Sequence, residues 1–348
     1  MKRLMKAAVL IEPGKIVMEN RPIPEPGDND VLVKMKHVGI CGSDVHYYQH
    51  GRIGDCVVRN PIVLGHESSG EVVKVGKNVT NVSVGDTVAL EPGYTCGRCM
   101  FCKTGRYNLC PDVVFMATPP YDGAFAEYVV HPADMAFKLP KGMSTIEGAL
   151  IEPLAVGFHA AKQANAQIGQ SAAILGAGCI GLVTLMTVKA MGITDAYVTD
   201  IIPKRIEKAK QLGATGVFKA DETDVVKAIN EITGGEGVDI VFETAGSKMS
   251  IQQTVQLVKR GGTIVLVGLA PEATISYDFI NLISKEASIH TVFRYRNVYP
   301  AAIKAVNEHL ADLRSIVTNI FKFGEVEKAM KFSVENAREI VKCVIEFD

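Results

Sequence analysis

The chain has 348 residues, of which 47% are hydrophobic and 22% are charged, and its formal net charge at pH 7 is -1. This length exceeds the roughly 250 to 300 residues at which a single hydrophobic core stops growing, so we expect two domains. A net charge near zero gives no general electrostatic footprint for nucleic acid or for an anionic membrane, and both classes of partner are disfavoured.

The N-terminus, MKRLMKAAVLIEPG, begins like a signal peptide. Lys6 interrupts its apolar run, the run is short, and no small-residue cleavage site follows. No unbroken apolar stretch reaches about 18 residues, so we do not expect a membrane span. These features favour a cytoplasmic protein, and stable disulfides are rare in that compartment.

Up to about residue 150 the sequence consists of short β-rich runs broken by Gly and Pro. Examples are KAAVLIE from Lys6, VLVKMKHVGI from Val31, GEVVKVG from Gly70 and DTVALEPG from Asp86. Such runs predict an antiparallel, barrel-like domain.

Candidate metal ligands are dispersed through this first region, at Cys41, His66, Glu67 and Glu152. Taken singly, a Cys is usually buried packing and a Glu is usually solvated surface. A mixed set of thiolate, imidazole and carboxylate is nevertheless what an open catalytic zinc site uses, with one position left for water or a substrate oxygen. Spacing alone leaves both interpretations open.

Four further cysteines cluster in CGRCMFCKTGRYNLC, at Cys96, Cys99, Cys102 and Cys110. Paired disulfides, buried small hydrophobic residues and chance clustering compete with zinc, and a reducing compartment removes the first of these. Gaps of two residues let successive thiolates converge on one cation, and the longer final loop closes a tetrahedron. Because all four ligands are cysteines, we expect a closed, structural zinc site.

After residue 170 the pattern changes to alternating strands and helices. Candidate strands begin at Ala172, Ala196, Gly216, Val238, Gly262 and Ser288. Six such strands with helices between most of them predict an α/β domain with a doubly wound parallel sheet. From about Thr291 the chain continues with a helix, AAIKAVNEHL, and a closing strand, EIVKCVIEFD, and periodicity does not show which domain they join.

The cofactor motif is GAGCIG, with Gly176, Gly178 and Gly181 between an apolar strand and a long apolar helix. In that context the glycines permit a tight turn and close backbone approach, and the helix N-terminus offers N–H groups to a pyrophosphate. Asp200 ends the next strand about 20 residues later, where an acid binds the ribose 2′-OH and favours NAD over NADP. It could instead cap the helix near Pro203.

Arg205 in the same helix could cover the adenine or be solvated, and the pattern does not decide between these roles.

Many short motifs together resemble the zinc-dependent medium-chain dehydrogenase/reductase family, and most of all its polyol-oxidising branch. The motifs span essentially the whole chain and are GICGSDVHYY, GRIG, LGHE, EPG, GRYNLCPD, ATPPYDGAFAEY, LIEPL, GAGCIG, VTD and VFRYRN. The resemblance implies a GroES-like β-barrel catalytic domain over residues 1–154 and 292–348. It also implies a Rossmann NAD-binding domain over residues 155–291.

The same resemblance implies that Cys41, His66 and Glu67 hold a catalytic zinc, so that each chain carries two zinc ions. Simple alcohol dehydrogenases of the family have a cysteine at the position of Glu152, whereas the polyol branch has this glutamate. Either Glu67 or Glu152 could bind the metal directly at a given stage of turnover. Zinc would polarise the alcohol oxygen while the nicotinamide accepts hydride.

Proton release is implied to run through Ser43 to His46, although His46 could equally be an exposed histidine without a role. Asp44 matches the family position that hydrogen-bonds the zinc-binding imidazole, and a turn or cap residue is the alternative.

Six residues are implied to face the substrate: Tyr47, Phe115, Thr118, Glu152, Arg294 and Tyr295. Their hydroxyls, carboxylate and guanidinium favour a polyol over a simple alcohol, because buried polar groups left unpaired cost about 1 to 3 kcal/mol each. The expected reaction oxidises the C2 hydroxyl of a sorbitol, L-iditol or xylitol type of polyol with NAD.

The alternatives are another zinc dehydrogenase of the family, acting on galactitol, butanediol or L-threonine, and a zinc-ribbon protein that binds nucleic acid or senses nucleotides. The compact cysteine cluster and the net charge disfavour the second.

The resemblance further suggests a homotetramer or a dimer, with contacts at the four-cysteine lobe and an edge strand near residues 262–268. Cys56, Cys179 and Cys343 lack metal spacing and are interpreted as packing residues.

Overall fold

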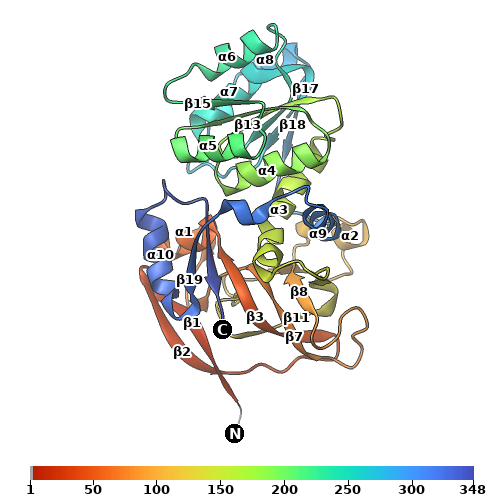
Figure 1. The fold of residues 1–348 in the computed structure, drawn as a ribbon, viewed down its shortest axis with the longest axis vertical. Helices are drawn as coiled ribbons and strands as arrows, with labels where there is room; N and C mark the ends of the chain where they lie inside the picture. Colours follow the sequence, from red (N-terminus) through yellow and green to blue (C-terminus); the bar gives the residue numbers. More distant parts are fainter. Residues whose placement is uncertain (1–2) are drawn as a thin grey trace. The chain divides into compact units, whose positions relative to one another are not determined.

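The computed structural model describes residues 3–348, and their contacts divide the chain into two units (Figure 1). Unit 1 comprises the residues up to Glu152 together with Tyr299–Asn307 and Leu313–Asp348. Unit 2 comprises Pro153–Val298 and Glu308–Asp312. The limits of the functional domains inferred from the resemblance, at residues 154 and 292, stay a prediction.

Unit 1 is built mainly of strands, with few helices. Its strands are β1 (Leu4–Glu12), β2 (Lys15–Pro22), β3 (Asp30–Ile40), β4 (Arg52–Ile53), β5 (Cys56–Val57), β6 (Ile62–Val63), β7 (Glu67–Val75), β8 (Thr87–Leu90), β9 (Gly93–Tyr94), β10 (Val114–Phe115), β11 (Tyr128–Pro132), β12 (Ala136–Lys138), β19 (Val317–Lys322) and β20 (Lys342–Glu346). Its helices are α1 (Gly42–His50), α2 (Met100–Lys103), α9 (Tyr299–Asn307) and α10 (Val326–Glu335), with short 3₁₀ turns at Tyr107–Leu109, Ala133–Met135, Leu313–Ile316 and Phe323–Glu325.

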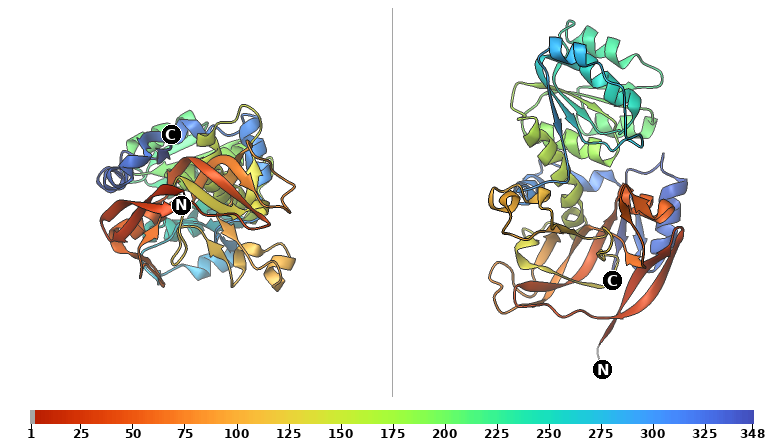
Figure 2. Two further views of the ribbon diagram at one scale, coloured as in Figure 1. Left: turned by 90° about the horizontal axis from the view of Figure 1, so that it is seen from below. Right: turned by 180° about the vertical axis from the view of Figure 1, so that it is seen from behind.

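The main sheet of unit 1 has seven strands in the order β12-β8-β7-β3-β20-β19, with β11 also paired to β3. Its pairs are antiparallel except β19 with β20. Strand β20 pairs with β3 so that Cys343 lies opposite Ile40, and Figures 1 and 2 show these C-terminal strands in blue. The predicted antiparallel domain is confirmed, and the last residues of the chain complete the sheet that the first residues begin.

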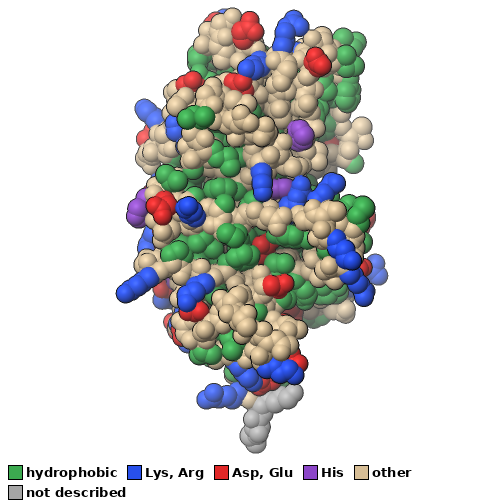
Figure 3. Space-filling model, turned by 90° about the vertical axis from the view of Figure 1, so that its right-hand side faces the viewer, with side chains coloured by type: hydrophobic (Ala, Val, Ile, Leu, Met, Phe, Trp, Pro, Cys, Tyr) green, Lys and Arg blue, Asp and Glu red, His purple; other side chains and the backbone are tan. Residues whose placement is uncertain are grey.

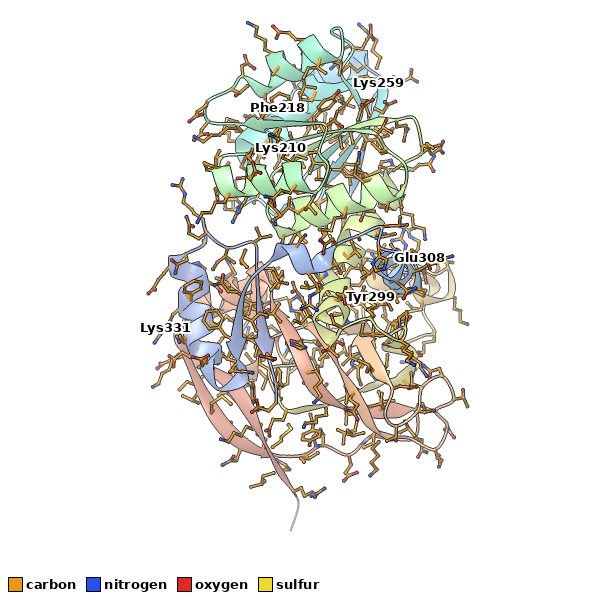
Figure 4. The ribbon with its side chains drawn as sticks, viewed as in Figure 1. Lys210, Phe218, Lys259, Tyr299, Glu308 and Lys331 are labelled. Carbon is orange, nitrogen blue, oxygen red and sulfur yellow. The ribbon has the colours of Figure 1, made fainter. Side chains whose placement is uncertain are left out.

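The core of unit 1 forms where apolar residues of these strands face inward. Helix α10 contributes Val326, Ala329 and Met330, which share one helical face and are at most 1% exposed. Tyr299 of α9, labelled in Figure 4, donates its hydroxyl to the carbonyl of Leu90 at 3.0 Å. The helix and strands of the C-terminal segment are therefore anchored to the N-terminal sheet.

Helix α3 (Thr145–Gln163) runs from unit 1 into unit 2 and contains Pro153. It begins with a reciprocal cap, because Ser144 N donates to Glu147 Oε2 at 2.8 Å and Glu147 N donates to Ser144 Oγ at 3.3 Å. Glu152, in the sequence LIEPL, lies on this helix.

Unit 2 is a parallel sheet covered by helices. Its elements are β13 (Ser171–Leu175), α4 (Cys179–Ala190), β14 (Asp195–Asp200), α5 (Pro203–Gln211), β15 (Gly216–Lys219), α6 (Val225–Ile232), β16 (Val238–Glu243), α7 (Lys248–Leu257), β17 (Val258–Leu266), α8 (Phe279–Ser284) and β18 (Ser288–Thr291). The strand order is β15-β14-β13-β16-β17-β18, and every pair is parallel. In Figure 1, α4 and α5 cover one face and α6, α7 and α8 the other, so the predicted doubly wound sheet is confirmed.

The expected edge strand near residues 262–268 is wrong. Those residues belong to or follow β17, which lies between β16 and β18, and the edge strands of this sheet are β15 and β18. The resemblance to the family suggested this edge strand, but the segment from Ser288 pairs with β17 and covers it.

Within residues 3–348, no helix is long and apolar enough to cross a membrane. On the face drawn in Figure 3, Lys and Arg side chains lie among Asp and Glu side chains at its upper and lower ends. This mixture agrees with the formal net charge of -1.

Candidate active site and metal centres

Cys41 lies at the junction of β3 and α1, where it is the N-terminal cap of the helix in extended conformation. Asp44, one turn later, accepts hydrogen bonds from Cys41 N at 3.0 Å and from Gly65 N at 2.9 Å. Its carboxylate is fully buried and therefore ties the start of α1 to the turn before β7. Gly65 has a φ of 87°, a conformation that glycine adopts without strain.

That turn places His66 and Glu67 beside Cys41. One ligand atom from each of these three residues lies within 4.8 Å of the others. His66 is 6% and Glu67 is 1% exposed. A Cβ at Gly39 would collide with the Glu67 carboxylate, so the glycine on β3 leaves the space that the carboxylate fills. Sequence reasoning missed this role of Gly39.

Lys342 is a functional neighbour that the sequence analysis did not identify. Its Nζ lies 2.6 and 2.8 Å from the two carboxylate oxygens of Glu67 and 3.1 Å from the carbonyl oxygen of Ile40. The lysine is 4% exposed, so both charges of this ion pair are buried. A lysine at the start of the mostly apolar strand KCVIE was the available signal, since a buried lysine needs a partner.

The electrostatics of this cluster favour a bound cation. Burial by itself lowers the pKa of His66, but the negative charges of Asp44 and Cys41 outweigh it and raise that pKa well above 6.5. His66 Nδ1 lies 3.6 Å from Asp44 Oδ1, slightly beyond hydrogen-bond distance. Asp44 thus acts as a turn residue and as an electrostatic partner of the imidazole. A thiolate, an imidazole and a carboxylate fit zinc with one position open.

Glu152 lies outside this group of three, as far as the described residues show. Its carboxylate is buried, at 6% exposure, near the end of the unit 1 part of α3. It acts at a distance on Glu91, whose pKa is raised to about 7 by burial and, in part, by the charge of Glu152. The arrangement puts Glu67 among the candidate ligands and leaves direct binding by Glu152 a prediction.

Several other predicted site residues of unit 1 lie on α1 and around β10. Phe115 is buried and its ring centroid lies 5.7 Å from that of His66, whereas Thr118 is half-buried in the following turn. On α1, Ser43 is half-buried, Tyr47 is buried and His46 is exposed. The ring centroids of His46 and His50 are 4.7 Å apart.

Arg294 and Tyr295 belong to unit 2, so their approach to the zinc ligands stays a prediction. Arg294 has a φ of 56°, and its guanidinium carbon lies 4.9 Å from the centroid of the Phe293 ring. Tyr295 is 3% exposed.

The four clustered cysteines form a second potential metal centre. The sulfur–sulfur distances are 3.5 Å for Cys99–Cys102, 3.6 Å for Cys96–Cys110 and 4.0 Å for Cys96–Cys102. A tetrahedral zinc with thiolates at about 2.3 Å has sulfur–sulfur edges of about 3.8 Å, whereas a disulfide bond is about 2.05 Å long. The geometry fits a closed zinc site.

Backbone N–H groups lower the pKa of one of the four thiols, whereas burial raises the pKa of Cys110 to about 11. The N–H groups of Arg98 and Cys99 lower the pKa of Cys96 to about 6, which favours the thiolate that zinc binds. Tyr107, between Cys102 and Cys110, donates its hydroxyl to Glu91 Oε1 at 2.6 Å and joins the cysteine lobe to the residues after β8.

The predicted cofactor turn lies between β13 and α4. Gly176 has a φ of 102°, and Gly178 is the N-terminal cap of α4. A Cβ at Gly181 would collide with the carbonyl oxygen of Gly176. The turn therefore requires glycine at its first and third positions, as a dinucleotide site does.

Asp200 contacts this turn from the end of β14. Its carboxylate accepts Ala177 N at 2.7 Å and Ile202 N at 2.9 Å. The N-terminal cap of α5 is Ile202, so Asp200 is not the cap residue of that helix. Arg205 lies beside the turn, since its Nη1 would be 3.9 Å from a Cβ at Gly178.

The remaining cysteines differ in exposure. Cys343 is buried, as expected of a packing residue, and Cys179 is half-buried. Cys56 is exposed, so its interpretation as a packing residue is wrong. It lies in the short β4–β5 hairpin, whose strands of two residues each bury little.

Known families and curated proteins match nearly the whole chain. Residues 27–141 match the alcohol dehydrogenase GroES-like domain, and residues 179–308 match the zinc-binding dehydrogenase family. The chain is 43% identical over 341 residues to the sorbitol dehydrogenase of Bacillus subtilis (strain 168), which covers 98% of this chain and 97% of that protein. The sorbitol dehydrogenase of Gallus gallus is 45% identical over 345 residues, with coverages of 98% and 96%.

Solved structures agree with these matches. An oxidoreductase/dehydrogenase of unknown specificity from Escherichia coli has a TM-score of 0.96 and 44% identity, covering 99% of this chain and 100% of that chain. A zinc-binding dehydrogenase from Sinorhizobium meliloti 1021 bound to NADP has a TM-score of 0.92 and 31% identity, with coverages of 99% and 100%. A short chain alcohol dehydrogenase from E. coli CFT073 complexed with NADH has a TM-score of 0.92 and 28% identity, with coverages of 99% and 99%.

The two metal-binding geometries, the glycine turn and the long matches lead to one assignment. The resemblance inferred from short motifs is confirmed by identities above 40% along more than nine-tenths of the chain. The chain belongs to the zinc-dependent medium-chain dehydrogenase/reductase family.

Proposed function

We propose that this chain is an NAD-dependent zinc polyol dehydrogenase. It oxidises the C2 secondary alcohol of a sorbitol, L-iditol or xylitol type of polyol to a ketose. The carbon–hydrogen bond at C2 gives its electron pair to nicotinamide C4 as hydride, the hydroxyl proton leaves to solvent, and the products are ketose, NADH and a proton. The observation that carries this proposal is the group of half-buried Cys41 with buried His66 and Glu67, together with full-length similarity to two sorbitol dehydrogenases.

Zinc bound by these residues supplies Lewis-acid polarisation of the alcohol oxygen. The protein contributes a buried environment in which Asp44 orients His66 and Lys342 compensates the charge of Glu67. Ser43 and then His46 carry the released proton outward in this proposal, and the exposed position of His46 suits the last step. Glu152 completes the catalytic set.

The polyol is held by Tyr47, Phe115, Thr118, Arg294 and Tyr295. Hydroxyl and guanidinium groups at such a site favour a substrate with several hydroxyls, because a simple alcohol would leave them unpaired.

NAD is proposed in preference to NADP. Asp200 is buried beside the glycine turn, where its carboxylate accepts hydrogen bonds from ribose hydroxyls and repels a 2′-phosphate. The N–H groups at the start of α4 suit the pyrophosphate.

The compartment and the assembly are further parts of the proposal. None of the eight cysteines forms a disulfide in the structure, which supports a reducing compartment such as the cytoplasm. The partners are a small-molecule polyol and further copies of the chain, as a tetramer or a dimer. Light scattering of the purified protein measures the number of copies.

Initial rates of NAD and NADP reduction test the function. The substrates are sorbitol, xylitol, galactitol, L-threonine, 2,3-butanediol and ethanol, each with and without a zinc chelator. We expect chelator-sensitive NAD reduction with sorbitol or xylitol and almost none with ethanol. Selective turnover of threonine or butanediol would overturn the polyol assignment, and faster turnover with NADP would overturn the role given to Asp200.

A further inference from the structure

A pair of polar residues outside the glycine motif lies where the dinucleotide site is expected. In the sheet order β15-β14-β13-β16-β17-β18, the strand sequence reverses between β13 and β16. Ligands of such sheets bind outside the carboxyl ends of the strands at this point. The glycine turn follows β13, and Glu243, Thr244 and Ala245 stand at the corresponding end of β16.

Thr244, which follows β16, forms hydrogen bonds with residues at the end of β13 and in the glycine turn. Its Oγ1 lies 3.0 Å from the carbonyl oxygen of Leu175 and 3.0 Å from that of Gly176, and its backbone N–H donates to Leu175 O at 2.9 Å. The Thr244 hydroxyl would also lie 2.9 Å from a Cβ at Gly181. The threonine therefore fills space that the glycines leave and contacts the turn that is expected to hold the pyrophosphate.

Glu243 holds Thr244 in place. Its Oε1 accepts hydrogen bonds from Ala245 N at 2.9 Å, Gly246 N at 2.8 Å and Ser250 Oγ at 2.7 Å. Its backbone carbonyl accepts Gly268 N, after β17, at 3.0 Å. Glu243 is fully buried, and these bonds fix the turn on both sides of Thr244.

We propose that Thr244, anchored by Glu243, is a positioning residue for the dinucleotide. Its hydroxyl holds the carbonyl side of the glycine turn, so that the N–H groups of the turn and of α4 face the pyrophosphate before the cofactor arrives. Glycine-rich turns have unusual backbone freedom, and restricting it in advance lowers the entropic cost of binding. The inference rests on the proposed function, since it assumes that a nicotinamide dinucleotide is the ligand.

The test compares Thr244→Val, which keeps the shape and removes the hydroxyl, with Thr244→Ser, which keeps the hydroxyl. Thr254→Val is the matched control, because Thr254 is a buried threonine of the same unit whose Oγ1 bonds Ile251 O and Tyr277 Oη at 2.7 and 2.8 Å. Calorimetric titration of the zinc-loaded proteins with NADH gives Kd, and initial rates give the KM values for NAD and polyol.

We expect Thr244→Val to raise the Kd for NADH and the KM for NAD about 5- to 10-fold, as loss of one hydrogen bond does. The KM for polyol and the zinc content should stay within twofold of the wild type, and Thr244→Ser and Thr254→Val should bind NADH like the wild type. If Thr244→Val does not fold, Thr244→Ala takes its place under the same criteria.

Two results would overturn the inference: an unchanged Kd in Thr244→Val, or an equal rise of Kd in Thr254→Val. Failure of the proposed function looks different, because the wild type itself would then bind no NADH.

Discussion

The two metal centres of unit 1 are built in opposite ways. The four thiols of the cysteine centre come from one short segment, residues 96–110. Backbone N–H groups of the same segment donate hydrogen bonds to the sulfur atoms of Cys96 and Cys99. The centre at Cys41, His66 and Glu67 combines three kinds of ligand, and its charge is compensated by a lysine that follows Glu67 by 275 residues.

This difference indicates which of the two metal centres can bind and activate a substrate. Four cysteines complete a tetrahedron and leave no place for a substrate, so the cysteine centre stabilises a lobe. Three ligands leave a position open, and the Glu67–Lys342 pair reduces the negative charge that a bound zinc experiences. The reactive centre therefore depends on contacts between distant parts of the chain, and the structural centre depends on spacing.

The largest expected effect is that of Cys41→Ser. Lewis-acid stabilisation by a metal contributes several kcal/mol, so kcat/KM for polyol should fall at least about a thousandfold. Zinc content, measured by mass spectrometry of the metal, should fall from two ions to one. Wild-type activity in this variant would contradict the placement of the reactive centre and would revive the zinc-ribbon interpretation.

In the zinc-free protein, replacement of Lys342 by Met should cost about 3 to 5 kcal/mol of unfolding free energy, because it leaves the Glu67 carboxylate buried without its partner. Lys322→Met on the neighbouring strand is the control. Its ion pair with Glu346 is exposed, at 62% and 37%, so water screens it and its loss should change the unfolding free energy little. Urea denaturation measures the unfolding free energy of both variants. Equal losses of unfolding free energy would show that the buried pair contributes no more than the exposed one. Adding Glu67→Gln to Lys342→Met should restore much of the lost stability.

Cys99→Ser removes a ligand of the cysteine centre and leaves the ligands of the reactive centre unchanged. Loss of the structural zinc should lower Tm by about 5 to 10 °C, since each kcal/mol shifts Tm by a few degrees in a chain of this size. Zinc content should again fall to one ion, while kcat/KM at 25 °C stays within about threefold. Cys56→Ser, at an exposed cysteine outside both centres, should change neither quantity. A collapse of kcat/KM like that of Cys41→Ser would mean that the cysteine centre takes part in turnover.

The smallest effect concerns Glu91, which accepts a hydrogen bond from Tyr107 of the cysteine lobe. The charge of Glu152 contributes to the raised pKa of Glu91. Burial raises its pKa from 4.5 to about 7, so the folded protein keeps a proton that the unfolded chain releases at lower pH. The stability due to this proton is complete below the unfolded pKa and is lost as the pH rises through about 7. Between pH 6 and 8, the wild type should lose about 1 kcal/mol relative to Glu91→Gln, which accepts the same hydrogen bond without titrating. Urea denaturation at each pH measures the unfolding free energy of both proteins. The same change in wild type and in Glu91→Gln between pH 6 and 8 would contradict the raised pKa of Glu91.

Much of the fold was predictable because its signals are local. The six strands of unit 2 were expected from apolar runs between helices, and all six are present. Their order could not be read from periodicity, since pairing is a contact between distant segments, and the edge strand suggested by the resemblance to the family was misplaced. The contribution of β20 beside β3 depended on the resemblance to a family.

By itself the sequence determined the sites that rest on spacing. The intervals between Cys96, Cys99, Cys102 and Cys110 predict a common cation, and the glycines of GAGCIG predict a tight turn, because neighbouring residues stay close in any fold. Only the tertiary structure decided how buried charges are compensated. It paired Lys342 with Glu67, bonded Asp44 of α1 to Gly65, and placed Thr244 against the glycine turn. A buried charge or hydroxyl accepts any partner of suitable chemistry, so its identity follows from the packing of strands and not from the sequence around it.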